Sequence, residues 1–386
     1  MKRRILFIDG PLGGGGAERV LIDILRNFDY SRYEVDLAVI CRGGALMDEV
    51  PPEVNVIELW KGYTWDYKLA FRLSKWLRCN WLFARKMNGK KLRRDYDAEI
   101  SFLEGMPLKL GALRTTSAKK ISWVHVDLHR FPYETSQFYS GEELEDYNRM
   151  DCIIHVSEDC KKAFLKRFPD CKAPSSIIYN PIDRKKITSS SLRPTGNDNV
   201  DSIRQQNNPE TNSVVNIVTV GRLTAQKNPK LWLEVVKGIK DLGLPAKFTW
   251  IGDGELKTDL IHECHKAEVE DIVEFTGFLK NPFPLIKEAD IMLMTSAFEG
   301  FGLVVCEAMC LGTPVISTAT AGPSEILGNN EYGRLTDHSA ESILNVLKEW
   351  IENPKLRDFY SKKALQRPDD YSIEKTLQNI YSLLAK

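Results

Sequence analysis

The sequence predicts an α/β protein made of two Rossmann-like domains that face each other across a cleft. Short apolar runs alternate with segments of helical period, and this alternation stops in a polar stretch and then starts again. Strands that alternate with helices indicate parallel sheets with crossover connections. The length of 386 residues is also long for a single core. We therefore expect a first domain at 1–183, a polar linker at 184–213 and a second domain at 214–370.

The first domain is expected to contain seven strands with helices between several of them. The expected strands are 4–9, 34–40, 55–59, 98–103, 119–125, 152–157 and 175–180, and helical patterns lie at 18–27 and 68–86. The linker is rich in Ser, Asn, Gln and Pro and cannot bury much apolar surface.

The second domain repeats the alternation. Its expected strands are 214–223, 246–254, 272–278, 289–296 and 313–318, and its expected helices are 230–242, 255–267, 304–311 and 340–352. In folds of this class a ligand binds beyond the carboxyl ends of the strands. We expect the ligand in the cleft between the domains.

Composition and charge narrow the classes of function. The chain has 53 Lys and Arg against 53 Asp and Glu, so the basic footprint of a nucleic-acid-binding protein is missing. The eight cysteines form no CxxC pair, and Cys306 and Cys310 are expected to be buried reduced thiols. The apolar run at 5–8 is too short for a signal peptide, and no stretch approaches a membrane span. We expect a cytoplasmic protein, and a peripheral position on the inner face of the membrane stays open.

Four consecutive glycines lie in the stretch ILFIDGPLGGGGAERVLIDIL, residues 5–25. The stretch is not a P-loop, because Ala-Glu-Arg follows where Gly-Lys-Ser/Thr is required, and no register fits a dinucleotide fingerprint. A bare loop before a helix offers N–H groups and close backbone approach to an anion. Contact with a ligand is therefore favoured over a plain tight turn.

A second pattern lies in SAFEGFGLVVCEAMCLGTPVIST, residues 296–318, where Glu299 and Glu307 form E-x7-E. The strand-to-helix turn between them comprises Gly300, Phe301, Gly302 and Leu303, and the first N–H groups of the helix should face the ligand. Apolar residues surround both glutamates, and Glu is rarely buried without a partner. A functional pair is favoured over a helix cap and a surface Glu.

A third pattern, VGRLTAQKNP at 220–229, places Arg222 and Lys227 just after a buried strand. Arg can bind phosphate through two parallel hydrogen bonds, and Lys acts as a point charge. Cations in loops are usually solvated, so this pattern is specific only in combination with E-x7-E.

Together these patterns resemble the retaining glycosyltransferases of family four, which have the two-domain GT-B fold. The resemblance rests on GRLxxxKN followed by FEGFGLVVCEAMxxGTPVIS, and on GGGGAERVL in the first domain. NPID at 180–183 and AGPSEIL at 321–327 also match the family. The tail 371–386 resembles the family's last helix, which crosses back to the first domain.

The resemblance implies a role for each candidate residue. Arg222 and Lys227 would neutralise the diphosphate of a nucleotide-sugar donor, with the N–H groups near Gly302 and Leu303. Glu307 would bind the ribose, Glu299 would bind the sugar, and the turn residues Gly300 and Phe301 would also contact the donor. The backbone of Phe278 and Leu279 would contact the base, and Gly15 and Gly16 would contact the phosphates. The family's histidine beside the donor sugar corresponds to His125, with His129 as the alternative, whereas His155 is expected in the core.

The implied reaction is sugar transfer with retention at the anomeric carbon. Leaving-group charge develops on the diphosphate, where fixed cations and N–H groups act most strongly. The two cations make a metal unnecessary, no cofactor is implied, and front-face attack needs no carboxylate nucleophile. UDP is the expected nucleotide, and a hexose or N-acetylhexosamine is the expected sugar.

The acceptor is less readable than the donor. Residues 75–94, KWLRCNWLFARKMNGKKLRR, interleave aromatic and basic side chains, which suits an anionic membrane surface. A core-packed helix with a solvated basic face explains them equally well. A membrane position would indicate a lipid-linked saccharide acceptor, as in surface polysaccharide assembly. A nucleotide-sugar epimerase and a non-catalytic nucleotide-sugar-binding module are the alternative functions.

Overall fold

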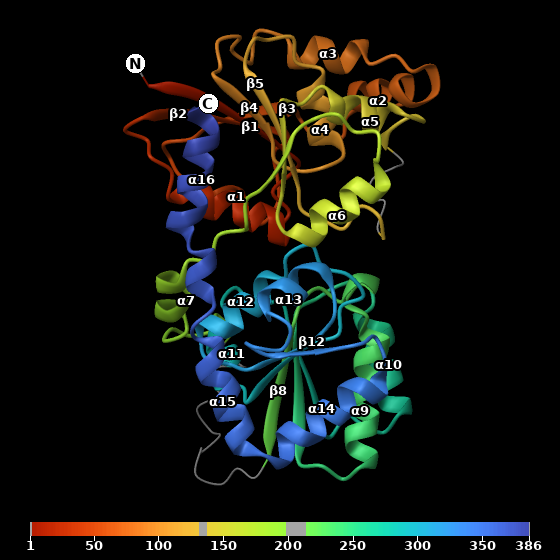
Figure 1. Cartoon of the computed structure of the whole chain (residues 1–386). Helices are drawn as coiled ribbons and strands as arrows, with labels where there is room; N and C mark the ends of the chain where they lie inside the picture. Colours follow the sequence, from red (N-terminus) through yellow and green to blue (C-terminus); the bar gives the residue numbers. More distant parts are fainter. Residues whose placement is uncertain (1, 131–136, 198–213, 386) are drawn as a thin grey trace. The chain divides into compact units, whose positions relative to one another are not determined.

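The computed structural model describes residues 2–130, 137–197 and 214–385. These residues form two α/β units, the first from Met1–Pro181 with Ile373–Lys386 and the second from Ile182–Ser372. Each unit has a parallel sheet with helices packed against it (Figure 1). The predicted fold class, two Rossmann-like α/β domains, is confirmed.

Unit 1 has, within its described residues, a seven-stranded parallel sheet of order β3-β2-β1-β4-β5-β6-β7. The strands are β1 Arg3–Asp9, β2 Tyr33–Cys41, β3 Asn55–Trp60, β4 Ala98–Ser101, β5 Lys119–Val124, β6 Cys152–His155 and β7 Ser175–Ile177. The run Ile5 to Ile8 in β1 is fully buried because β2 and β4 flank it and helices cover the sheet. The ends of β1, β4 and β5 are therefore adjacent.

The helices of unit 1 pack against its sheet or against one another, and α4 is buried along its whole length. They are α1 Gly16–Arg26, α2 Trp65–Leu77, α3 Trp81–Met87, α4 Met106–Ala112, α5 Glu142–Asn148, α6 Glu158–Arg167 and α16 Ile373–Ala385. In α16, the ring of Tyr381 stacks on Tyr33 with centroids 5.3 Å apart, and its hydroxyl accepts a hydrogen bond from the Asp29 N–H at 2.7 Å. These contacts make the last helix of the chain part of unit 1.

Unit 2 has, within its described residues, a six-stranded parallel sheet of order β10-β9-β8-β11-β12-β13. The strands are β8 Val215–Val220, β9 Ala246–Ile251, β10 Val273–Gly277, β11 Ile291–Met294, β12 Val315–Thr318 and β13 Arg334–Thr336. The helices are α7 Arg184–Ser190, α9 Pro229–Asp241, α10 Lys257–Lys266, α11 Phe283–Glu288, α12 Leu303–Cys310, α13 Ala321–Ile326, α14 Ala340–Glu352 and α15 Pro354–Ala364. Figure 1 shows α9 and α14 beside the strands, where Trp232 and Trp350 are fully buried in one core.

Two expectations about local structure are wrong. The polar segment at 184–213 begins with helix α7, whose first turn is capped by the Asp183 carboxylate accepting from the Lys186 N–H at 2.9 Å. Residues 198–213 of the predicted linker lie outside the described residues. The single helix predicted at 68–86 is split into α2 and α3, because Arg78 adopts a left-handed conformation with φ 50° that ends α2.

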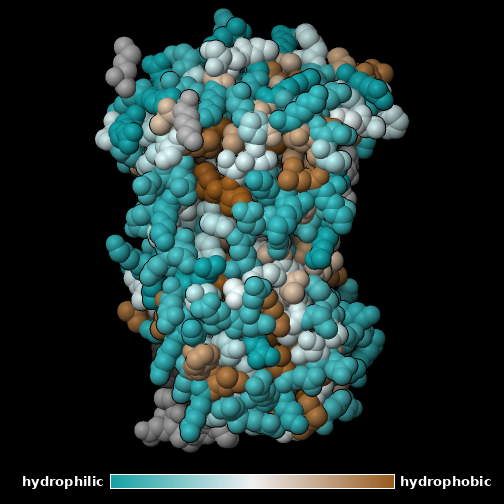
Figure 2. All heavy atoms as spheres, viewed as in Figure 1, coloured by the Kyte–Doolittle hydropathy of each residue, from teal (hydrophilic) through white to brown (hydrophobic). Residues whose placement is uncertain are grey.

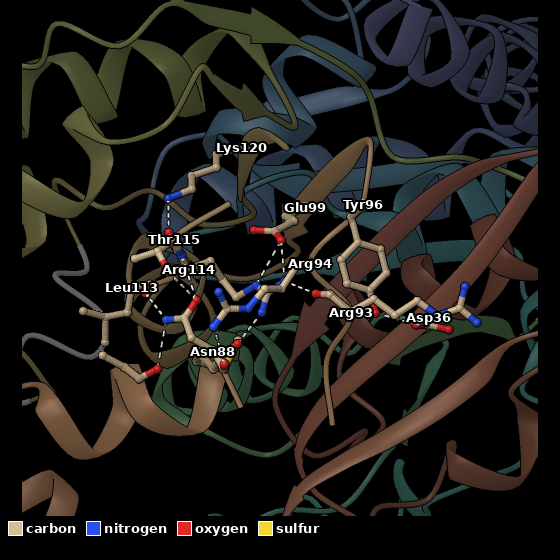
Figure 3. Close-up of polar contacts among 12 residues, drawn as sticks. Asp36, Asn88, Arg93, Arg94, Tyr96, Glu99, Leu113, Arg114, Thr115 and Lys120 are labelled. Carbon is tan, nitrogen blue, oxygen red and sulfur yellow. Dashed lines mark hydrogen bonds and ion pairs between the residues drawn. The ribbon is translucent and has the colours of Figure 1, made fainter. Parts of the chain in front are cut away.

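A polar network around the buried Arg114 contacts the end of the basic segment 75–94, whose Arg93 and Arg94 side chains are exposed (Figure 3). The buried side chain of Arg114 donates to Glu99 Oε1 at 2.7 Å and to the Arg93 carbonyl at 2.6 Å. Arg93 also pairs with Glu34 at 2.9 Å, and Arg94 donates to the Asn88 carbonyl at 3.2 Å. The cations at the end of this segment therefore serve the fold of unit 1.

Among the residues that the structure describes, every helix is too short or too polar to cross a bilayer.

Candidate active site

The carboxyl end of the sheet in unit 2 gathers most of the predicted residues. Arg222 and Lys227 follow β8, and Glu299 follows the neighbouring strand β11. Glu307 lies in α12, and Phe278 follows β10 at the far side of β9. As the positions of the strand ends predict, these residues lie at one edge of one sheet.

Lys227 and Glu299 form a tight ion pair. The ammonium Nζ lies 2.5 Å from Glu299 Oε1, and the Ser296 hydroxyl donates to the same oxygen at 2.9 Å. Both side chains are largely buried, with 16% and 9% of their surfaces exposed. Because water screens such a pair little, it fixes the position of the ammonium group at the sheet edge.

The backbone around Lys227 is shaped to hold its side chain. A Cβ on Gly221 would lie 2.7 Å from Lys227 Cε, so the lysine stem passes where another residue's side chain would be. The Thr295 hydroxyl donates to the Lys227 carbonyl at 3.0 Å, and the Ala297 N–H donates to the Gln226 carbonyl at 2.8 Å. The loop after β8 is thereby tied to the loop after β11.

Arg222 contrasts with Lys227. Its side chain is exposed, and among the described residues it makes no ion pair or side-chain hydrogen bond. Its backbone is nevertheless fixed, because the next residue, Leu223, is buried and donates its N–H to the Asp253 carbonyl at 3.0 Å. Arg222 is therefore a positioned cation with its charge available to an external anion.

The glycine-rich turn starts α12 as the sequence predicts. Gly302 is the N-cap residue with φ 87°, and Leu303 is the first helical residue. A Cβ on Gly322 would lie 2.0 Å from the Phe301 carbonyl oxygen, so α13 can approach this turn only through a glycine. Glu307 is partly exposed one turn into α12, and Gly300 is buried in the turn.

The aromatic and apolar residues near the turn have different exposures. The Phe301 ring is buried against Tyr371, with centroids 5.3 Å apart, so its backbone is the part that can face a ligand. Leu279 is buried, whereas Phe278 is 64% exposed just beyond Gly277. Phe278 offers an aromatic face to a flat ligand group.

The remaining predicted residues lie in unit 1. Gly15 is the N-cap residue of α1 and Gly16 its first residue, one position after Gly14 with φ 96°. No side chain caps this helix start. A Cβ on Gly15 would lie 2.3 Å from Glu18 Oε2, so the Glu18 carboxylate lies close to the N-cap residue without making a capping hydrogen bond.

The three histidines considered from the sequence differ in burial. His125 follows β5, is buried, and packs its ring against Phe102 with centroids 4.9 Å apart. Burial lowers the pKa of His125 to about 3, so the imidazole is neutral. His129 is exposed, and its N–H donates to the Asp127 carboxylate at 3.0 Å. His155 is fully buried beside Phe164, which confirms it as a core histidine.

Two buried carboxyls in unit 1 are not among the site residues predicted from the sequence. Asp9 ends β1, and its Oδ1 accepts the Gly10 N–H at 2.7 Å. Glu104 follows β4, and its Oε2 accepts the His125 N–H at 3.2 Å. Burial raises the pKa of Asp9 well above its usual range and that of Glu104 to about 7. The signal for Asp9 was an acidic residue at the end of a buried strand.

Cys306 and Cys310 are buried and unpaired, as expected. Across residues 2–130, 137–197 and 214–385, His, Cys, Asp and Glu form no group of three that could hold a metal ion.

Comparison with known proteins matches both units. Residues 14–186 match the model described as Glycosyltransferase Family 4, and residues 199–367 match Glycosyl transferases group 1. An uncharacterized glycosyltransferase of Methanocaldococcus jannaschii is 30% identical over 60% of this chain and 63% of its own length. The lipopolysaccharide 1,6-galactosyltransferase of Escherichia coli is 22% identical over 86% of this chain and 84% of its own.

A third relative is the N-acetylgalactosamine-N,N'-diacetylbacillosaminyl-diphospho-undecaprenol 4-alpha-N-acetylgalactosaminyltransferase of Campylobacter jejuni, 27% identical over 57% of this chain and 56% of that protein. The chain thus spans less than two thirds of the length of this relative and of the M. jannaschii protein.

Solved structures share the fold. Anabaena HepE in complex with UDP and glucose superposes with a TM-score of 0.75 at 20% identity, covering 99% of both chains. Staphylococcal TarM in complex with fondaparinux, alpha-GlcNAc-glycerol and UDP gives a TM-score of 0.73 at 15% identity and full coverage of both chains. With both domain models matched in order along one chain, this protein belongs to the family of GT-B glycosyltransferases whose two domains are Glycosyltransferase Family 4 and Glycosyl transferases group 1.

Proposed function

We propose that this chain is a retaining glycosyltransferase that moves a hexose or N-acetylhexosamine from a UDP-sugar to a saccharide or lipid-linked saccharide in surface polysaccharide assembly. The observation that carries the proposal is the pair of cations at the end of β8. Arg222 is exposed and unpaired among the described residues, and Lys227 is held by Glu299 at 2.5 Å. Two positioned cations suit a diphosphate.

The start of α12 adds to the same charge pattern. Its first N–H groups follow Gly302 at the edge of the sheet that carries Arg222 and Lys227. A helix N-terminus and two cations stabilise negative charge that develops on the leaving diphosphate. They do the work that a divalent ion does in other transferases, so no metal is required in this proposal.

Glu299 is proposed to bind a sugar hydroxyl and to hold Lys227, without acting as a nucleophile. Its Oε1 already receives the Lys227 ammonium and the Ser296 hydroxyl. Those contacts lower the nucleophilicity of the carboxylate. Front-face attack fits better: the acceptor oxygen bonds to the anomeric carbon, the bond to the diphosphate breaks, and the acceptor proton passes to the leaving phosphate oxygen. Retention follows because attack and departure use one face.

The remaining donor contacts are proposed from their positions. Glu307 of α12 would accept hydrogen bonds from the ribose hydroxyls, and the exposed ring of Phe278 with the Leu279 backbone would meet the base. In unit 1, Gly15 and Gly16 are assigned to phosphate contacts and His125 to the donor sugar. UDP is supported by the UDP complexes of HepE and TarM, which share this fold.

A panel assay tests the donor and the stereochemistry. We expect UDP release from one of UDP-glucose, UDP-galactose, UDP-N-acetylglucosamine or UDP-N-acetylgalactosamine, stimulated by a short-chain polyprenyl-diphosphate saccharide or a methyl glycoside, in the presence of EDTA. Proton NMR of the product should show the anomeric configuration of the donor. An inverted product contradicts the mechanism. Donor conversion without any acceptor would favour an epimerase, and tight UDP binding without turnover would favour a binding module.

Peripheral membrane binding is part of the proposal, but its surface shifts from residues 75–94 to α2. The aromatic residues of the predicted segment separate, since Phe83 is buried whereas Trp76 and Trp81 are exposed. Trp65 and Trp76 are 77% and 80% exposed on α2, whose inner side buries Tyr67, Ala70 and Ser74. In Figure 2 hydrophobic atoms lie at the surface beside α2, at the upper right, among hydrophilic ones. Exposed tryptophans of this kind suit a bilayer interface.

The charges on α2 favour anionic lipid. The exposed cations around the tryptophans are Lys68, Arg72, Lys75, Arg78 and Arg85. Asp66 is the acidic residue of α2, and its carboxylate accepts a hydrogen bond from Thr64. Basic side chains near a membrane surface gain about 1 kcal/mol each from anionic lipid.

Vesicle sedimentation tests this surface. We expect the protein to sediment with vesicles containing phosphatidylglycerol at low salt and less with phosphatidylcholine alone. Trp65→Ala with Trp76→Ala should reduce the bound fraction at least fivefold. Phe359→Ala, which removes a 51% exposed aromatic residue from α15, is the matched control and should bind normally. Equal binding by the double variant and the control contradicts the assignment.

A further inference from the structure

Three strand ends of unit 1 bring unpaired polar groups to one place. Asp9 ends β1, Glu104 follows β4 and His125 follows β5, and these strands are neighbours in the sheet. Ile8 is in register with Ser101, and the Phe102 N–H donates to the Ile8 carbonyl at 2.9 Å. The register therefore places Asp9 next to the segment that leads into Glu104.

The two carboxyls have no counter-charge. Among the described residues neither Asp9 nor Glu104 forms an ion pair, although Asp9 is fully buried and Glu104 is 3% exposed. The nearest charges are acidic, because Glu18 and Glu104 raise the pKa of Asp9 after burial itself. Natural proteins seldom bury two carboxyls in this way unless the pair has a function.

Buried hydrogen-bonding atoms without a partner accompany these carboxyls. Asp9 Oδ2 and both ring nitrogens of His125 lack a hydrogen bond of good geometry among the described residues, and the Phe102 backbone is the polar group that acts on the buried His125 ring. An unsatisfied buried polar atom destabilises the folded state. Open space also lies just beyond Asp9, since a Cβ added to Gly10 would meet no atom within 4 Å.

A neutral hydroxyl is the ligand that matches this set. A hydroxyl donates one hydrogen bond, which suits an oxygen of one carboxyl, and it accepts others, which suit the protonated second carboxyl and a ring N–H of the neutral histidine. Metal is a poor match, because the described residues contain no group of three ligating side chains.

We propose that Asp9 and Glu104, with the His125 ring beside them, hold the attacking hydroxyl of the acceptor saccharide. This inference rests on the proposed function. The two carboxyls would orient the hydroxyl before transfer, while the proton still passes to the leaving diphosphate. Glu104 would also keep His125 in place through the 3.2 Å hydrogen bond to its N–H.

Separating acceptor kinetics from donor binding tests the inference. Glu104→Gln and Asp9→Asn keep the side-chain shapes and remove the carboxylates. With the acceptor of highest rate in the panel above, we expect the acceptor KM to rise at least tenfold in each variant. The Kd for UDP, measured by calorimetry, should change less than twofold. Glu145→Gln, an exposed glutamate of α5, is the control and should leave both quantities unchanged.

The outcomes separate this inference from the function on which it rests. If the wild-type protein releases UDP from no donor in the panel, the proposed function fails. If it transfers sugar and both variants keep a normal acceptor KM, only the hydroxyl site is overturned. A parallel loss of UDP binding, or failure of both variants to fold, would show that the carboxyls have a structural role and would also overturn the site.

Discussion

Replacing Arg222 by alanine is expected to lower sugar transfer by about 10²–10³-fold while leaving the stability of the protein unchanged. The side chain is exposed and makes no ion pair within the described part of the chain, so its removal should not change the free energy of unfolding. In the proposed site its charge would act on the diphosphate, where the negative charge increases toward the transition state. Steady-state kcat/KM and a thermal unfolding curve, measured on the same preparation, check both halves of the expectation.

Lys227→Ala is expected to cause a similar loss of transfer but with a loss of stability. The ammonium neutralises the largely buried Glu299 carboxylate at 2.5 Å, so its removal leaves a buried charge without a partner. A further change of Glu299 to alanine should recover stability without recovering transfer. Recovery of both would show that Lys227 acts only through the fold.

Two neighbouring variants control for nonspecific effects of charge. Lys230→Ala removes an exposed cation from α9, three residues beyond Lys227, and should retain full transfer. Arg222→Lys keeps the charge but cannot form two parallel hydrogen bonds, so an intermediate rate is expected. Near-normal transfer by Arg222→Ala contradicts the assignment of the diphosphate site.

The convergence of the residues proposed to bind the donor could be predicted because the ends of parallel strands meet at one edge. Arg222, Lys227 and Glu299 follow β8 and β11, which the apolar runs identify, and parallel strands bring their carboxyl ends to one edge. The 2.5 Å ion pair between Lys227 and Glu299 was not predicted, because it depends on the path of two loops. The absence of a side chain at Gly221 leaves space for the Lys227 side chain, and the sequence around Gly221 does not indicate that this space is needed.

Other features depend on contacts distant in the sequence. The break at Arg78 has no Gly or Pro to indicate it, and a left-handed arginine is uncommon. Strand β13 has three residues, too few for a period to be recognised. Glu104 follows a predicted strand, but its burial requires α5 and α6 to cover it, and helices α4, α5 and α6 were not predicted.

Relative to wild type, Glu104→Gln is expected to gain stability as pH rises. Replacing a carboxyl with a lowered pKa has the opposite effect, because the variant then loses stability relative to wild type as pH rises. Burial raises the pKa of Glu104 from 4.5 to about 7, so the folded state holds this proton more tightly than the unfolded chain. Between pH 4.5 and about 7 the unfolded chain loses the proton first, and the wild-type protein becomes less stable as pH rises. Above that window the cost is roughly 3–4 kcal/mol from this group.

Glutamine cannot ionise, so the variant should escape this loss. The groups that face Glu104 are Asp9 from β1, Glu18 from α1, Glu143 and Tyr147 from α5, Cys160 from α6 and the N–H of His125. Except for that N–H, they are acidic or neutral, and Arg167 is already paired with Glu143 at 2.8 Å. Urea unfolding should therefore show Glu104→Gln more stable than wild type at pH 8 and no more stable at pH 5, with Glu145→Gln following wild type at both. A variant that gains stability at pH 8 while its acceptor KM rises would show that the protein retains a destabilising carboxyl for binding. If the variant and the wild-type protein instead differ in stability by the same amount at both pH values, the raised pKa of Glu104 is contradicted.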